Sequence, residues 1–348
     1  MWLNLPETQI VGVADADAKG LAGALAKLKV GQGFADYREM LRVTKPDLVA
    51  IGPRSVGQHR EMVLAAVEAG VRGIYMEKPM CASLAEADAM LAACQAKNVK
   101  LALAHRNRYQ PTLPVVAEMI KAGQLGRLLE VRGRGKEDAR GGCVDLWVLG
   151  SHVLNVAVYF AGRPTACTAT LLQDGKLATP ADLREGTEEL GLVAGNELHA
   201  RFETERNIPI FFDSVQNAGA KEAGFGLQLI GTRGVVDFRI DETPVAHFRA
   251  GSPFKPALGK GSEWVPITSA GLGMPEPIAD LKQQAGGHLL GGRDLIAAIK
   301  EDRAPLCSGE DGRVTVEMAT AVLLSHVRGG VRVGWPLEAR ENPLAGWK

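Results

Sequence analysis

Residues 10–15 read IVGVAD, an apolar run that ends in an acidic residue. This pattern is typical of a buried parallel strand that delivers a carboxylate, here Asp15, to the ribose of a dinucleotide. The glycine-rich turn of such domains, G-x-G-x-x-G, normally lies about 20 residues before that acid, and here it would fall upstream of Met1. We therefore expect a dinucleotide-binding sheet that lacks its first strand and its glycine-rich turn. A misplaced or truncated start would explain this, and so would genuine loss of the cofactor site.

Asp15 has a second interpretation, because an acidic residue before a helix often caps its first turn. Asp17 is the better candidate for that cap. We therefore expect Asp15 to contact the ribose, where a carboxylate would repel a 2′-phosphate, so NAD is favoured over NADP.

The pattern after this strand alternates short apolar runs with amphipathic helical stretches, which predicts βαβ units and a parallel sheet. Later segments alternate apolar and polar residues, which favours an antiparallel sheet with one covered face. The expected fold is thus α/β, with a Rossmann-like parallel-sheet domain at 1–106 and an α+β domain with a mainly antiparallel open sheet at 107–348. The expected strands are 47–53, 73–79, 99–105, 128–136, 197–205, 208–215, 225–232, 234–240 and 331–337, and the expected helices are 16–28, 34–41, 59–70, 84–98, 293–302 and 312–329. Residues 173–197 and 251–287 are expected to be long loops.

Charge and composition exclude several classes of protein. The 348 residues contain 40 Lys and Arg against 40 Asp and Glu, which argues against a nucleic-acid or membrane-surface partner bound by bulk electrostatics. Five scattered cysteines without CxxC spacing suit reduced thiols and give no readable zinc site. No signal pattern and no apolar run of about 20 residues is present. We expect a soluble, cytoplasmic protein without a metal site.

Several segments together resemble one family. YMEKPM at 75–80 is similar to the Glu-Lys-Pro signature of the glucose-fructose oxidoreductase, inositol dehydrogenase and MocA (Gfo/Idh/MocA) family. The segments 13–17, 51–59, 85–111, 141–152 and 305–319 resemble further family segments in the family's order. The resemblance covers the whole chain except the missing beginning, and it implies an NAD-linked sugar or polyol dehydrogenase.

The resemblance implies two catalytic residues. Lys78 follows a strand at the edge where ligands of open α/β sheets bind, and its ammonium can hydrogen-bond a substrate hydroxyl and help it to lose its proton. Pro79 after it is a candidate for a cis peptide bond, and Glu77 is expected at the cofactor. His152 lies in a predicted helix whose spacing brings Asp145, Val148 and Asn155 near one face. From the residues alone, His152 reads as a core histidine; the resemblance makes it the general base.

The sequence departs from the family pattern beside this histidine. Members commonly have an Asp four residues earlier, where this chain has Val148, and many have a second Asp where Asn155 stands. In a continuous helix Asp145 lies about 10.5 Å of rise from His152, too far for direct contact.

For the further candidate residues, a binding role and a purely structural role are equally supported by the sequence. Pro53, Arg54 and His59 follow a predicted strand at the ligand edge of the sheet and are expected at the cofactor, although His59 would equally suit the first turn of a surface helix. Arg106 could contact a cofactor phosphate and Arg108 a substrate carboxylate, or both could form interdomain ion pairs.

Three more side chains complete the expected substrate site. Tyr109 follows these arginines, Asp145 and Asn155 flank His152, and Trp147 could stack on a sugar or lie in the core.

The expected function is NAD-dependent oxidation or reduction of a secondary hydroxyl on a sugar, cyclitol or glycoside. The alternatives are a redox-inactive carbohydrate-binding or assembly protein and an NAD-assisted glycoside-cleaving enzyme. The resemblance also implies a homo-oligomer, a dimer or tetramer, associated through the open face of the second sheet.

Overall fold

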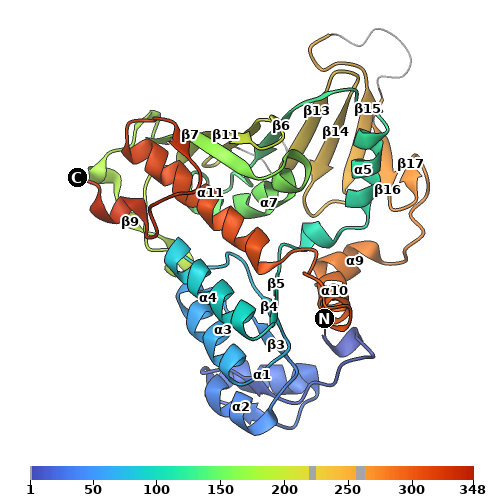
Figure 1. Cartoon of the computed structure of the whole chain (residues 1–348), viewed down its shortest axis with the longest axis vertical. Helices are drawn as coiled ribbons and strands as arrows, with labels where there is room; N and C mark the ends of the chain where they lie inside the picture. Colours follow the sequence, from blue (N-terminus) through green and yellow to red (C-terminus); the bar gives the residue numbers. More distant parts are fainter. Residues whose placement is uncertain (1, 219–224, 256–262) are drawn as a thin grey trace.

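The computed structural model describes residues 2–218, 225–255 and 263–348. Two sheets, each with its own helices, occupy the two halves of the molecule, and the long helix α11 lies at their junction (Figure 1). The smaller, blue half is formed by the first hundred residues, and the larger half carries the wide sheet.

The first sheet is parallel and has the order β3-β4-β5. Its strands are β3 (Leu48–Ile51), β4 (Gly73–Met76) and β5 (Lys100–Leu103), with α3 (His59–Glu68) and α4 (Leu84–Ala96) as the crossover helices. Helix α10 (Leu289–Lys300), from near the chain's other end, packs on β4. Gly73 permits this contact, because a Cβ there would lie 2.6 Å from Ile299 Cδ1.

A second parallel pair stands apart from this sheet. β1 (Val13–Ala14) pairs only with β2 (Gly33–Phe34), and α1 (Ala18–Leu28) and α2 (Tyr37–Thr44) pack on the pair. Among the described residues no strand joins β1 to β3. The expectation of a buried strand at 10–15 is therefore wrong in part: the strand is two residues long and Val11 is 39% exposed, because the far edge of β1 has no partner.

The second sheet has eleven strands in a mostly antiparallel order. β6 and β12 form its one parallel pair among the described residues. Along the sheet the order is β17-β16-β15-β14-β13-β6-β12-β11-β7-β18, with β8 beside β7. The strands are β6 (Leu128–Arg134), β7 (Pro164–Gln173), β8 (Lys176–Leu177), β11 (Glu197–Thr204), β12 (Ile210–Val215), β13 (Gly226–Gly231), β14 (Gly234–Arg239), β15 (Ala246–Ala250), β16 (Val265–Thr268), β17 (Gly271–Leu272) and β18 (Val333–Gly334).

Helices cover one face of this sheet. α6 (Cys143–Val148) and α7 (Gly150–Ala161) pack on its central strands, α11 (Gly309–Val327) packs on β7 near one end, and α5 (Thr112–Lys121) packs on β16 near the other. The 19-residue α11 begins with a capping box in which Ser308 and Asp311 bond reciprocally to each other's backbone N–H. Helix α11 contacts β5 of the first sheet and β7 of the second, so it belongs to the core of the whole molecule.

The fold class expected from the sequence is confirmed, and several elements were missed. β7, α5 and β15 were not predicted. The expectation of long loops was wrong in part, because 173–197 contains β8, η4 (Pro180–Asp182), β9 (Arg184–Glu185), η5 (Thr187–Glu189) and β10 (Leu192–Val193), and 251–287 contains β16, β17 and α9 (Leu281–Gly286). The remaining short turns are η1 (Trp2–Asn4), η2 (Val56–Gln58), η3 (Arg106–Tyr109) and η6 (Pro343–Gly346).

Candidate active site

Lys78 lies directly after β4, and its side chain reaches into the second half of the molecule. Its Nζ donates to the carbonyl oxygen of Val148 at 2.7 Å, at the last residue of α6. The Lys78–Pro79 peptide bond is cis, as the sequence suggested. The ammonium is thus held by a backbone carbonyl, which leaves its other donors for a ligand.

His152 lies in the first turn of α7 and packs against a second imidazole. The rings of His152 and His105 meet edge to face with centroids 5.2 Å apart. Both side chains are buried, and Nδ1 of each has no hydrogen-bond partner in the described part of the chain. His105, which follows β5, was not predicted as a site residue, because an isolated histidine after a strand gives no sequence signal.

Burial sets the protonation of these three groups. It lowers the pKa of His152 well below the usual value, and the neighbouring charge of Lys78 adds to the effect. Burial also lowers the pKa of His105 to about 3. The pKa of Lys78 is lowered by burial, which the carboxylates of Glu77 and Glu188 partly oppose. A neutral imidazole beside a lysine of lowered pKa can accept a proton from a hydroxyl that the lysine orients.

The helix expected around His152 is broken. α6 ends at Val148 and α7 begins at Gly150, with Leu149 between them at φ −118° and ψ −43°. Asp145 therefore faces elsewhere: its Oδ2 accepts from Ser214 Oγ at 2.6 Å and from the backbone N–H of Glu137 at 3.2 Å. The expected contact of Asp145 with substrate is not supported, because this carboxylate is completely buried and burial raises its pKa.

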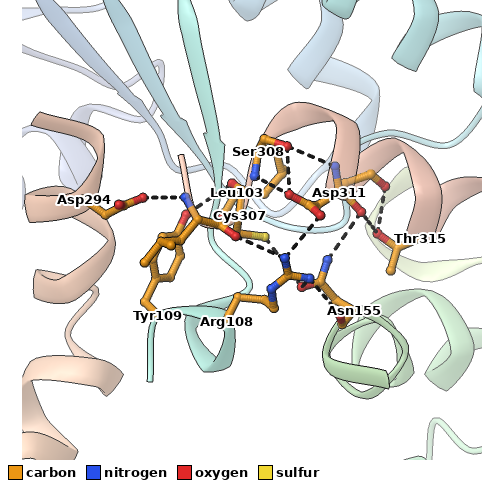
Figure 2. Close-up of polar contacts among 11 residues, drawn as sticks. Leu103, Arg108, Tyr109, Asn155, Asp294, Cys307, Ser308, Asp311 and Thr315 are labelled. Atoms are coloured by element: carbon orange, nitrogen blue, oxygen red, sulfur yellow. Dashed lines mark hydrogen bonds and ion pairs between the residues drawn. The ribbon is translucent and has the colours of Figure 1, made fainter. Parts of the chain in front are cut away.

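Three other expected substrate contacts form a structural network instead (Figure 2). Arg108 donates to the backbone oxygen of Asn155 at 3.0 Å and to Asp311 at 3.2 Å. Asn155 donates to the backbone oxygen of Asp311, and the hydroxyl of Tyr109 donates to the backbone oxygen of Leu103 at 2.9 Å. These side chains are buried and join η3, α7 and the start of α11, which indicates a structural role for Arg108, Tyr109 and Asn155; their contact with substrate stays a prediction.

His59 is also engaged by the protein. It begins α3 as one alternative predicted, but it is completely buried rather than on the surface. Its Nε2 lies 2.9 Å from the carbonyl oxygen of Pro53 and its Nδ1 lies 3.1 Å from that of Met80. It therefore braces the loops that follow β3 and β4, and it has no free nitrogen for a cofactor. Arg54 beside it is exposed.

At the amino-terminal end, Asp17 caps α1 by accepting from the backbone N–H of Gly20, as its position suggested. Asp15 accepts only from the backbone N–H of Asp17, at 2.9 Å, and remains exposed after β1. Within the described part of the chain, its second carboxylate oxygen accepts no hydrogen bond, which leaves it available to a ligand hydroxyl.

Arg106 forms an ion pair with Asp241 at 2.6 Å, the interdomain alternative that the sequence left open.

His288, which was not predicted, lies between two residues of the β4 end. Its Nδ1 lies 3.0 Å from the hydroxyl of Tyr75, and its Nε2 lies 3.9 Å from the carboxylate of Glu77. Trp147 is 2% exposed, so the core alternative holds for it.

These residues could hold the two ends of a dinucleotide, but not its pyrophosphate. Asp15 and Lys78 lie at the carboxyl ends of parallel strands, as the ribose and nicotinamide ends require. The sequence contains no G-x-G-x-x-G, and the described residues offer no such turn for a pyrophosphate. The described residues hold no cluster suited to a metal ion, and none of their helices is long and apolar enough to cross a membrane.

A family model for oxidoreductases with an NAD-binding Rossmann fold matches residues 1–105. These residues are therefore similar to the Gfo/Idh/MocA family. D-apiose dehydrogenase of Paraburkholderia graminis is 30% identical over 178 residues, 48% of this chain and 47% of that protein. Levoglucosan dehydrogenase of Pseudarthrobacter phenanthrenivorans is 25% identical over 262 residues, 67% of this chain and 66% of that protein. The matches thus span about half to two thirds of these relatives.

Solved structures of oxidoreductases share the fold over nearly the whole chain. An NAD-binding oxidoreductase from Klebsiella pneumoniae has a TM-score of 0.74 at 19% identity, covering 97% of this chain and 93% of that one. Levoglucosan dehydrogenase in complex with NADH and L-sorbose has a TM-score of 0.74 at 20% identity, covering 94% and 89%. At this identity the likeness shows a common fold for both halves of the chain.

Proposed function

We propose that this protein carries the catalytic site of an NAD-dependent oxidoreductase that acts on a secondary hydroxyl of a sugar, cyclitol or glycoside. The observation that carries the proposal is the hydrogen bond of Lys78 to the carbonyl oxygen of Val148, just before α7, together with the lowered pKa of the buried His152 in α7, on which the charge of Lys78 acts. The names of the relatives, which include D-apiose and levoglucosan dehydrogenases, support a sugar as the substrate class.

The chemistry assigns one task to each residue. Lys78, fixed by the carbonyl of Val148, donates to the substrate oxygen and orients the reacting carbon. A ring nitrogen of His152 would accept the hydroxyl proton, because the lowered pKa leaves the imidazole unprotonated, with a lone pair available. The nicotinamide ring, when bound, accepts the hydride that leaves the same carbon. Alcohol becomes ketone, and one proton and one hydride leave it.

The cofactor would be held at both ends by residues of parallel strands. Asp15, exposed after β1, has a carboxylate free to accept from a ribose hydroxyl and would repel a 2′-phosphate, which favours NAD. Arg54 and Glu77 lie on loops braced by His59 and are the further candidates. Free reduced cysteines and balanced charge support a cytoplasmic location.

Association through the second sheet is part of the proposal. β6 and β11 alternate buried and exposed residues, and helices cover only one face of this sheet. We expect a dimer or tetramer in light scattering, and a monomer at micromolar concentration would contradict this.

The activity is tested by NADH absorbance during incubation with NAD and a panel of sugars, cyclitols and glycosides. Sugar-dependent NADH formation supports the proposal. If the protein binds NAD but only cleaves a glycoside, without net NADH, the glycoside-cleaving alternative takes its place. If it binds sugars, but neither this chain nor one extended by a strand and a glycine-rich turn binds NAD, the redox-inactive alternative takes its place.

A further inference from the structure

A cavity of about 230 Å³ lies in the second half of the molecule, beside the Lys78 site. None of its side chains was expected at a site. Its lining residues come from the ends of β7, β11 and β12, from the loop before α6 and from the β9–η5 segment: Ala139, Arg140, Val144, Gln173, Arg184, Thr187, Asn196 and Gln216. The volume is below the roughly 300–1,000 Å³ of drug-sized pockets, so it suits part of a small polar molecule.

Three connections tie this cavity to Lys78. Val144 lies one helical turn before Val148, whose carbonyl holds the Lys78 ammonium. The charges of Arg140 and of Glu188, which follows the lining residue Thr187, act on Lys78. The η5 turn that carries Thr187 also contacts η2, in the loop after β3. Helix α6 and the η5 turn therefore connect the cavity with the segments around Lys78.

The lining residues offer unused hydrogen-bond donors. Arg140 uses Nε and Nη2 on the carboxylate of Asp138, which leaves Nη1 available. The guanidinium of Arg184 is exposed and forms no ion pair or hydrogen bond within the described part of the chain. The amides of Asn196 and Gln216 are instead occupied by neighbouring protein groups.

The charge of the lining is positive. Both charged residues in it are arginines, and Asp138 neutralises only Arg140. Asp174 lies near the rim, but its carboxylate accepts from the amides of Gln173 and Asn196 and is not part of the lining. The guanidinium of Arg184, which no carboxylate in the lining neutralises, matches one carboxylate, because the two groups can form two parallel N–H···O bonds.

We propose that this cavity binds the carboxylate of a sugar acid whose reacting hydroxyl lies at Lys78 and His152. The inference rests on the proposed function and narrows its substrate class from sugars in general to polyhydroxy acids. Arg184 is the residue that sets this specificity, because its charge is the one not neutralised by the protein.

The test is calorimetric titration of the full chain with D-glucuronate, D-galacturonate, D-gluconate, D-glucose and D-glucose 6-phosphate. At least one acid should bind more tightly than glucose. Arg184→Met should weaken its binding about tenfold or more, the usual effect of losing a charged hydrogen-bond partner, and should leave glucose binding unchanged. Arg127→Met is the matched control, because Arg127 is exposed and lies outside the cavity.

Three results would overturn the inference: no acid binds more tightly than glucose, the phosphate ester binds best, or Arg184→Met leaves acid binding unchanged. Separate NADH measurements keep the two proposals apart. NADH formed only from neutral sugars contradicts this inference alone, whereas arginine-dependent acid binding without NADH formation from any substrate contradicts the proposed function alone.

Discussion

At the scale of single residues, the ammonium of Lys78 is held by a backbone carbonyl oxygen of Val148. The family pattern described above commonly has an Asp at this position. The side chain of Val148 is buried, and its carbonyl takes the hydrogen bond of Lys78. A carbonyl carries only a partial charge, so it supports the ammonium less than an ionised carboxylate does. This explains why burial is the largest cause of the lowered pKa of Lys78.

Val148→Asp tests this interpretation. A carboxylate at this position favours the charged form of Lys78 and raises its pKa, so the pH profile of turnover should shift upward. Val148→Asn is the control, because it changes size and polarity in the same way without adding charge. Identical profiles for the two variants would show that position 148 does not act on the lysine.

The two buried imidazoles make stability depend on pH. An unfolded histidine takes up a proton near pH 6.5, whereas burial keeps His105 neutral down to about pH 3 and holds the pKa of His152 well below the usual value. The unfolded state therefore binds more protons below that pH, and the free energy of unfolding falls as pH falls. Between pH 6.5 and pH 5 the loss is about 2 kcal/mol for His105, and His152 contributes in the same direction. Asp145, whose pKa is raised, has the opposite sign and offsets part of it.

Urea unfolding of the wild type and of His105→Phe at about pH 7 and pH 5 measures this effect. The variant removes one of the two imidazoles and should lose about half of their contribution. An equal pH dependence in both proteins would mean that His105 is protonated in the folded state at pH 5.

At the scale of elements, the sequence predicted those whose own pattern determines them. The helices at 16–28 and 84–98 carry capping residues, Asp17 and Ser83, in front of apolar periodicity, and the structure confirms both. The break at Leu149 was not predictable, because LWVLGSHVL reads as one helix and the interruption depends on tertiary contacts of α6 with β12. For the same reason, the alignment of Asp145 with His152 on one face was wrong.

The candidate site, like the elements, could be predicted from the sequence only in part. The family resemblance pointed to Lys78 and His152, and in the structure the charge of Lys78 acts on the imidazole of His152. His105 and His288 come close only through the fold, from after β5 and before α10. Arg108 and Asn155 have polar side chains that suit a substrate, but their partners at the start of α11 lie more than 150 positions away in sequence and could not be inferred.

The Arg108 network gives a prediction about these elements. Arg108→Met leaves the carboxylate of Asp311 and the backbone oxygens of Asn155 and Leu306 without their donor. Because the guanidinium is mostly buried, we expect a loss of roughly 3 kcal/mol in the free energy of unfolding, measured in urea. The exposed control Arg127→Met should change it by less than about 0.5 kcal/mol. Equal stability of the two variants would contradict the structural role.

At the scale of the whole molecule, α10 and α11 join the two halves, while the first sheet is divided. β1 and β3 each have an edge without a strand among the described residues. A strand between them would complete one parallel sheet and would carry a glycine-rich turn to the point where Asp15 and Lys78 face a common ligand edge.

This arrangement predicts the effect of an added segment. A chain extended before Met1 by about 25–30 residues that carry a strand and G-x-G-x-x-G should bind NAD at least about tenfold more tightly than the 348-residue chain. The control extension has valines in place of the glycines. Micromolar binding of NAD by the unextended chain, measured by calorimetry, would contradict the prediction and require another segment to hold the phosphates.

The central claim, hydride transfer at Lys78 and His152, is tested most directly with deuterium. The unextended and extended chains are incubated with NAD and a panel of carbon-deuterated sugars, cyclitols and sugar acids, and the mass of the NADH is measured. The account predicts deuterium in NADH from at least one substrate. It also predicts that Lys78→Ala and His152→Ala lower the rate of transfer about 100-fold or more. Absence of labelled NADH with every substrate, or undiminished transfer in both variants, would contradict it.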